Sequence, residues 1–96
     1  MTINMFSYAG SFGENKDKAR DVRIEKIMPV LAQGKEVVLD FEGVSGVTQS
    51  FIHALISEPI RQYGDDVYDY LKFANCTDVV REVINIVADY MQESEQ

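Results

Sequence analysis

The feature that most constrains the fold is a short, almost uninterrupted apolar run near the middle of the chain. Residues 37–41 read VVLDF and stand between the charged pair Lys35-Glu36 and Glu42-Gly43. Such a short run suits a strand better than a helix, and near-continuous apolarity is typical of a strand that is covered on both faces. We therefore predict a central buried strand over residues 37–41, with Asp40 at its carboxyl end.

Segments with helical periodicity lie on both sides of this run. The first predicted helix covers residues 17–33, where apolar side chains recur at i, i+3, i+4 and i+7 (Ile24, Ile27, Met28 and Leu31). Pro29 should kink it, because proline removes a helical hydrogen bond, and Gly34 should end it. A second helix should follow the loop 43–48, with Thr48 or Ser50 as its cap and a second kink at Pro59, where Ser57 is a candidate for restarting the helix. Its predicted buried stripe is Phe51, Ile52, Leu55, Ile56 and Ile60.

The two ends of the chain complete an alternating pattern. Residues 3–8 and 67–74 read as strands, and a last helix should begin after a cap at Asn75. Its apolar stripe is Val80, Val83, Ile84, Val87, Ala88 and Met91. The predicted order is β-α-β-α-β-α, which gives a largely parallel sheet with helices packed on it, an α/β fold. We expect one domain over residues 1–96, with residues 91–96 as a frayed polar tail and, as an option, a further short strand within 8–12 forming an initial hairpin.

Composition narrows the class of protein. The 96 residues are 46% hydrophobic, which is enough for one core, and the net charge of −7 disfavours binding to nucleic acid. No apolar run approaches the roughly 20 residues that cross a bilayer, so we expect no membrane association. The single cysteine, Cys76, cannot form an intramolecular disulfide, which fits a reducing compartment. We expect a cytoplasmic protein.

Residues 38–55 carry a resemblance to a known family. The segment VLDFEGV at 38–44, followed by TQSF at 48–51, resembles the STAS-like domains of unknown function, which are relatives of the sulphate-transporter and anti-sigma-factor-antagonist domain. The later segment LKFANC at 71–76, which leads into an apolar helix, is similar to that family as well. The resemblance implies a regulatory module whose partner is a histidine-kinase-type ATPase or a sigma-regulatory protein.

The resemblance also points to particular residues. In the anti-sigma-factor antagonists an Asp-Ser-Ser-Gly stretch begins a helix, and its second serine is phosphorylated; on this chain these positions fall on Thr48, Gln49, Ser50 and Phe51. Ser50 is thus the candidate phosphoacceptor, although its acidic and small neighbours are replaced. A hydroxyl at a helix start suits either a phosphate or a cap, so both roles stay open for Ser50. We expect Thr48, Gln49, Ser50 and His53 to bind the partner.

Chemistry other than binding finds little support in the sequence. His53 follows Ser50 by three residues, yet no nucleophile-elbow motif is present, so we expect no catalytic residues and no enzyme. One histidine and one cysteine do not make a metal site, and no cofactor motif occurs. The leading hypothesis is a non-catalytic protein-interaction module that docks its partner near Ser50. The alternative is a small acidic inhibitor, encoded by a phage or plasmid, that occupies a basic surface of a host machine.

Overall fold

A computed structural model of the chain describes residues 1–94. In chain order the elements are β1 (Thr2–Asn4), α1 (Phe6–Ala9), β2 (Phe12–Gly13), α2 (Lys16–Val22), the π-helical turn η1 (Arg23–Ile27), α3 (Met28–Ala32), β3 (Val37–Asp40), β4 (Gly46–Val47), α4 (Gln49–Tyr63), the 3-10 helix η2 (Gly64–Asp69), β5 (Leu71–Ala74) and α5 (Asp78–Ser94). The predicted α/β class is confirmed.

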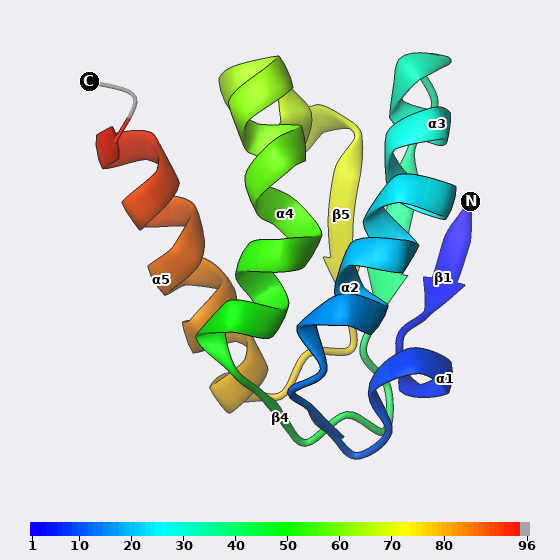
Figure 1. Cartoon of the computed structure of the whole chain (residues 1–96), viewed down its shortest axis with the longest axis vertical. Coiled ribbons are helices and arrows are strands. Elements are labelled where there is room, and N and C mark those ends of the chain that lie inside the picture. Colours follow the sequence, from blue (N-terminus) through cyan, green and yellow to red (C-terminus); the bar gives the residue numbers. More distant parts are fainter. Residues whose placement is uncertain (95–96) are drawn as a thin grey trace.

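The main sheet has three parallel strands in the order β1-β3-β5, so β3 is central as predicted. Ile3, Leu39 and Phe73 lie opposite one another across the three strands. Connections between neighbouring parallel strands are right-handed. When successive strands are added in the same direction along a sheet, these connections place their helices on the same face. Accordingly α2, α4 and α5 lie side by side, with α4 in the middle in contact with both neighbours (Figure 1).

One face of the sheet is left largely open, which corrects the expectation that the central strand is covered on both faces. Leu39 is fully buried beneath the helices, whereas the next side chain, Val38, points to the other face and is only half-buried. Thr2 and Lys72, which lie beside Val38 in the register, are exposed. The apolar run at residues 37–39 therefore reflects a buried face and a half-buried one, and the domain has two layers.

The first helix differs from the prediction through the π-helical turn η1. Ile24 was expected in the buried stripe but is 48% exposed, while Val22 and Ile27, five residues apart, are buried. The Met28 N–H donates to the Arg23 carbonyl, a bond that also spans five residues. Pro29 has no N–H, and its ring would clash with a carbonyl of the preceding turn, so one extra residue is accommodated upstream of it. The extra residue rotates the turns around it relative to a regular helix, so the buried face differs from the one that a 3.6-residue period predicts.

The two outer strands are shorter than predicted. The first strand was expected over residues 3–8 but ends at Asn4, whose side-chain Oδ1 accepts the Phe6 N–H at 3.1 Å and turns the chain into α1. The optional hairpin does not form, because β2 pairs in parallel with β4 instead. The third strand was expected over 67–74 and begins only at Leu71, since residues 64–69 form η2.

The second and last helices also depart from the prediction at named residues. α4 continues through Pro59, and Ser57 is buried in its middle, so Ser57 does not restart a helix. α5 runs to Ser94, so residues 91–94 are helical and not a frayed tail; residues 95–96 lie outside the described part of the chain. The predicted stripes are otherwise confirmed, except that Val83 and Ala88 of the α5 stripe are half-buried. Buried residues of α4 and α5 that were expected in the core are Phe51, Ile52, Leu55, Ile56, Ile60, Val80, Ile84, Val87 and Met91.

Candidate functional site

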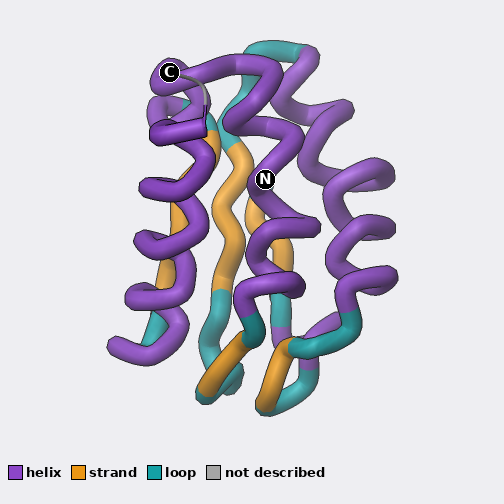
Figure 2. Tube along the Cα trace, turned by 60° about the vertical axis from the view of Figure 1, so that its left-hand side comes forward, coloured by secondary structure: helices purple, strands orange, loops and turns teal. Residues whose placement is uncertain are grey.

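The three long helical segments begin at the same edge of the molecule, the carboxyl edge of the sheet. Each has a polar residue that caps its first turn: Asn15 for α2, Thr48 for α4 and Thr77 for α5. The two-residue strands β2 and β4 lie at this edge as well, beside the helix starts (Figure 2). In α/β folds the carboxyl ends of the strands are the usual place for binding, because loops and helix starts meet there.

Thr48 is the cap of α4, which settles the choice between Thr48 and Ser50. The Phe51 N–H donates to Thr48 Oγ1 at 3.1 Å, and Thr48 has the extended backbone of a capping residue. Ser50 is the second residue of the helix, exposed, with its Oγ 3.2 Å from Thr48 Oγ1. The Ser50 hydroxyl therefore stands at the helix start without being needed to begin the helix.

The residues predicted to bind a partner are brought together. Gln49, Ser50 and His53 are exposed on the first turns of α4, and Thr48 is half-buried directly before them. Gln49, Ser50 and His53 border a groove of about 490 Å³ that opens between α4 and α5, and Thr48 lies outside its lining. Its other lining residues are Lys16 at the start of α2, Ala54, and Ile86, Val87 and Tyr90 of α5. The prediction missed the α5 side, because sequence periodicity alone did not show which outer residues of α5 would face α4.

The loop that leads into α4 is held in place by hydrogen bonds to segments distant in the sequence. Ser45 donates to the Ser11 carbonyl both from its N–H and from its Oγ, each at 2.8 Å. Thr77 Oγ1 donates to the Ser45 carbonyl at 3.1 Å, and the Thr48 N–H donates to the Gly13 carbonyl at 2.9 Å. The start of α4 is thus fixed relative to β2 and to the start of α5.

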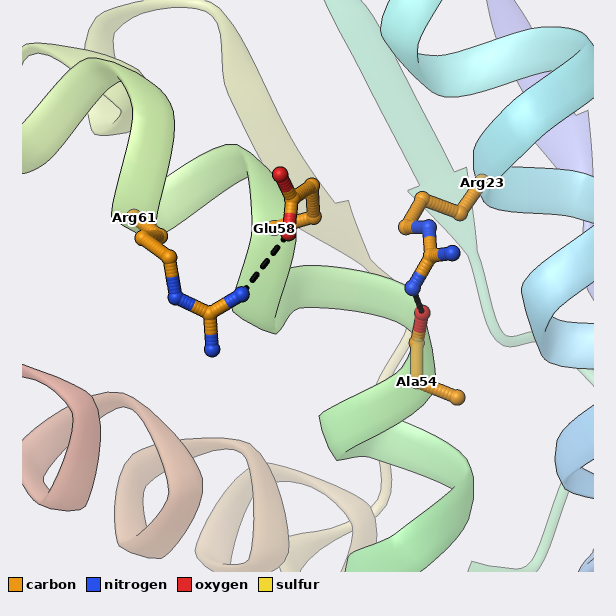
Figure 3. Close-up of polar contacts among 4 residues, drawn as sticks. All are labelled: Arg23, Ala54, Glu58 and Arg61. Carbon is orange, nitrogen blue, oxygen red and sulfur yellow. Dashed lines mark hydrogen bonds and ion pairs between the residues drawn. The ribbon is translucent and has the colours of Figure 1, made fainter.

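Arg23 connects the π-helical turn to α4 (Figure 3). Its Nη1 donates to the Ala54 carbonyl at 3.3 Å, one turn beyond Ser50. Further along α4, Arg61 pairs with Glu58 at 2.7 Å, an exposed i, i+3 pair that contributes little to stability. The sequence prediction missed the Arg23 contact, because the π-helical turn determines where Arg23 points.

Asn75 does not cap the last helix as predicted, and it contacts Asp40 instead. Asn75 has a φ of 56°, a left-handed conformation that asparagine tolerates, and its Nδ2 donates to Asp40 Oδ1 at 3.0 Å. The cap of α5 is Thr77, which accepts the Val80 N–H at 3.2 Å. The hydrogen bond from Asn75, together with one from the Glu42 N–H, lowers the pKa of the Asp40 carboxyl.

Cys76 lies at the same edge but has the properties of a structural thiol. Its side chain is half-buried, and burial raises the pKa of the thiol. A raised pKa keeps the sulfur protonated at neutral pH, where a thiol is a poor nucleophile and a poor metal ligand.

Within residues 1–94 no three histidine, cysteine or carboxylate side chains gather as metal ligands. Ser50 and His53 share a face of α4, but the hydrogen bond of Ser50 is with Thr48. None of the helices described is both long and apolar enough to span a bilayer.

Comparison with known proteins agrees with this fold. Residues 18–81, two thirds of the 96-residue chain, match the sequence model of a family described as a STAS-like domain of unknown function. The matched region begins in α2, contains β3, β4, α4 and β5, and ends in the first turn of α5. A search of curated proteins and a search of solved structures each found no match. The family match covers the central motif and the helix start at Ser50, and the chain belongs to the family of STAS-like domains of unknown function.

Proposed function

We propose that the chain is a non-catalytic regulatory module that binds a partner protein through the start of α4. The family supports a regulatory or interaction role. The observation that carries the proposal is the position of Ser50, exposed at the second residue of α4 while Thr48 does the capping. Changing Ser50 therefore alters the surface and leaves the first turn of the helix intact.

The proposed switch is a change of charge at Ser50. A phosphate there adds a charge of about −1.5 to −2 and three acceptor oxygens. Gln49 and His53 lie exposed beside it, so a bound partner would cover the modified group. Placing a new charge at a tight interface carries a desolvation cost, so phosphorylation would release the partner. On the family resemblance, the partner is a histidine-kinase-type ATPase or a sigma-regulatory protein.

The test begins with the chain as bait in a lysate of its native host, and the captured protein is then purified for binding measurements by calorimetry. Ser50→Glu should raise Kd at least about tenfold, a change of about 1.4 kcal/mol. Ser50→Ala should leave Kd nearly unchanged. The matched control is Ser7→Glu, which adds the same charge at an exposed serine of α1. Equal effects of Ser50→Glu and Ser7→Glu would contradict docking at α4.

The absence of catalysis is part of the proposal and has its own test. Purified protein incubated with ester, phosphoester and nucleotide substrates should turn over nothing above buffer, because among residues 1–94 the Ser50 hydroxyl pairs with Thr48 and no third group orients His53 against it. Turnover that disappears in His53→Ala would show that the helix start is an active site instead.

A further inference from the structure

Helix α5 carries two apolar rows with the same spacing, offset by one residue. The inner row recurs at intervals of four, three and four residues and packs into the core: Val80, Ile84, Val87 and Met91. The outer row repeats these intervals one residue earlier: Val79, Val83, Ile86 and Tyr90. In this outer row Val79 is 56%, Ile86 43% and Tyr90 61% exposed, while Val83 is half-buried against the core. Alternating intervals of three and four are the spacing with which one helix packs against another.

The carboxyl-terminal half of the outer row borders the groove beside α4. Ile86 and Tyr90 line the groove on the α5 side, while Ser50, His53 and Ala54 line it on the α4 side. From Val79 to Tyr90 the helix rises about 16 Å, or three turns, which is long enough to contact three turns of another helix. The row therefore has the length for one added helix, and the groove adjoins its Ile86–Tyr90 end.

Charge indicates what kind of helix fits. A third row on α5, one residue earlier again, is polar and exposed: Asp78, Glu82, Asn85 and Asp89. Its three carboxylates form one border of the outer apolar row. The cation that lines the groove is Lys16, at the start of α2. A helix lying on the outer row would thus meet carboxylates along one flank, where lysine or arginine side chains would be favoured.

A second copy of this chain is a poor occupant for the same reason. Two α5 helices packed antiparallel about a twofold axis would place the Asp78, Glu82 and Asp89 row of one copy against the same row of the other. Facing like charges are destabilising, and each copy also carries a net charge of −7. The spacing of the outer apolar row therefore favours a helix as the binding partner, and the acidic row beside it favours a helix with basic side chains.

We propose that the outer row of α5 (Val79, Val83, Ile86 and Tyr90) binds an amphipathic helix of a partner protein, with an apolar row on α5 and a basic flank on the acidic row. This deepens the proposed function, since the groove adjoins Ser50, and it rests on that function for the identity of the partner. The bound helix would lie along α5, and its basic flank would face away from Lys16.

The test uses a synthetic amphipathic peptide as the probe. A fluorescent peptide of roughly 18 residues, about five helical turns, carries leucine on one face and lysine on the other; matched peptides have glutamate for lysine or a scrambled order. Fluorescence anisotropy should show binding of the leucine-lysine peptide alone, weakening several-fold when salt is raised from about 0.05 to 0.3 M because charges are screened.

Variants of the protein locate the binding surface. The double variant Ile86→Ser, Tyr90→Ser should bind the peptide at least about tenfold more weakly, because tyrosine is a common interface anchor and the loss of Ile86 removes further apolar surface. Ile24→Ser is the matched control, the same change at an isoleucine of similar exposure on the π-helical turn, and should bind as the wild type does. If the double variant melts early, Tyr90→Ser alone carries the comparison, since Tyr90 is 61% exposed.

Three results would overturn the inference. One is wild-type binding by the double variant, and another is equal binding of the leucine-lysine and leucine-glutamate peptides. The third is a stable dimer in analytical ultracentrifugation that Tyr90→Ser makes monomeric, which would show that a second copy covers the row. None of these affects the response of the native partner to Ser50→Glu, so the docking proposed at α4 succeeds or fails independently.

Discussion

Replacing Thr48 with alanine removes the hydroxyl that accepts the Phe51 N–H at 3.1 Å in the first turn of α4. Loss of a threonine cap costs about 0.5–2 kcal/mol of unfolding free energy. The Phe51 side chain is fully buried and its N–H is part-buried, so water replaces the lost acceptor poorly. We therefore expect a cost in the upper part of that range, about 1–2 kcal/mol.

The loss of unfolding free energy in Thr48→Ala is to be compared with that in Ser50→Ala. Ser50 is exposed and lies one residue inside the helix, so its loss should change the unfolding free energy by less than about 0.5 kcal/mol. Urea unfolding followed by circular dichroism measures both variants. In thermal melts a difference of about 1 kcal/mol corresponds to roughly 4–8 °C in Tm for a domain of this size. Thr48→Ser, which keeps the hydroxyl, should recover most of the loss.

The outcome that would refute this reasoning is an equal loss in both alanine variants. It would mean that the pair of hydroxyls 3.2 Å apart acts as a unit and that Ser50 has a structural role after all. The case for Ser50 as a surface switch would then lose its structural basis, because a change there would also disturb α4.

Further predictions concern the sheet, its carboxyl edge and the thiol. Leu39→Asp should unfold the domain, since an unpaired buried charge costs several kcal/mol against a total of about 5–15, whereas Val38→Asp on the open face should leave a cooperative thermal melt. Asn75→Gly keeps a residue that accepts the left-handed backbone but removes the amide, so NMR titration should show the pKa of Asp40 rising toward its ordinary value of 3.8. Because the folded-state pKa of Asp40 is lowered, its contribution to stability is present above about pH 4 and is lost as the pH falls through the folded pKa, and Asn75→Gly should flatten this acid dependence. Cys76 should react with iodoacetamide more slowly at pH 7.5 than in urea-unfolded protein, since burial raises its pKa.

Most of the fold could be predicted because the spacing of apolar residues is regular over most of each helix, even where the helix is locally irregular. The inner row of α5 and the buried stripe of α4 were identified from spacing alone, and the central strand followed from its apolar run. The order of these elements then determined the parallel sheet, since alternating strands and helices have few other compact arrangements.

The predictions of the fold fail in two places. One is where an inserted residue changes the helical period, and the other is where two polar side chains are both candidates for a helix cap. The π-helical turn moved Ile24 to the surface, and a 3.6-residue pattern cannot anticipate one inserted residue. At the start of α5, Asn75 and Thr77 are both acceptable caps by composition; Asn75 is instead recruited by Asp40, 35 residues away in the sequence. Long-range contacts of this kind have no local signal.

The sequence predicted the α4 side of the groove and not the α5 side. Thr48, Gln49, Ser50 and His53 do lie together at one helix start, because they are neighbours in sequence on one turn of α4. The α5 side of the groove was missed, since Ile86 and Tyr90 had no assigned partner element before the packing of α5 on α4 was known.

The pairing of the three strands has a consequence for the rate and order of folding. Within the described residues both outer strands pair with β3 alone, and each pairing joins residues far apart in the chain: Ile3 lies 36 residues before Leu39, and Phe73 lies 34 residues after it. The entropy of closing a loop depends only on the logarithm of its length, so these two closures cost almost the same. Chain length therefore gives neither half of the sheet priority, and we expect the packing of the connecting helical segments, α2 to α3 before β3 and α4 after it, to decide whether β1 or β5 joins β3 first.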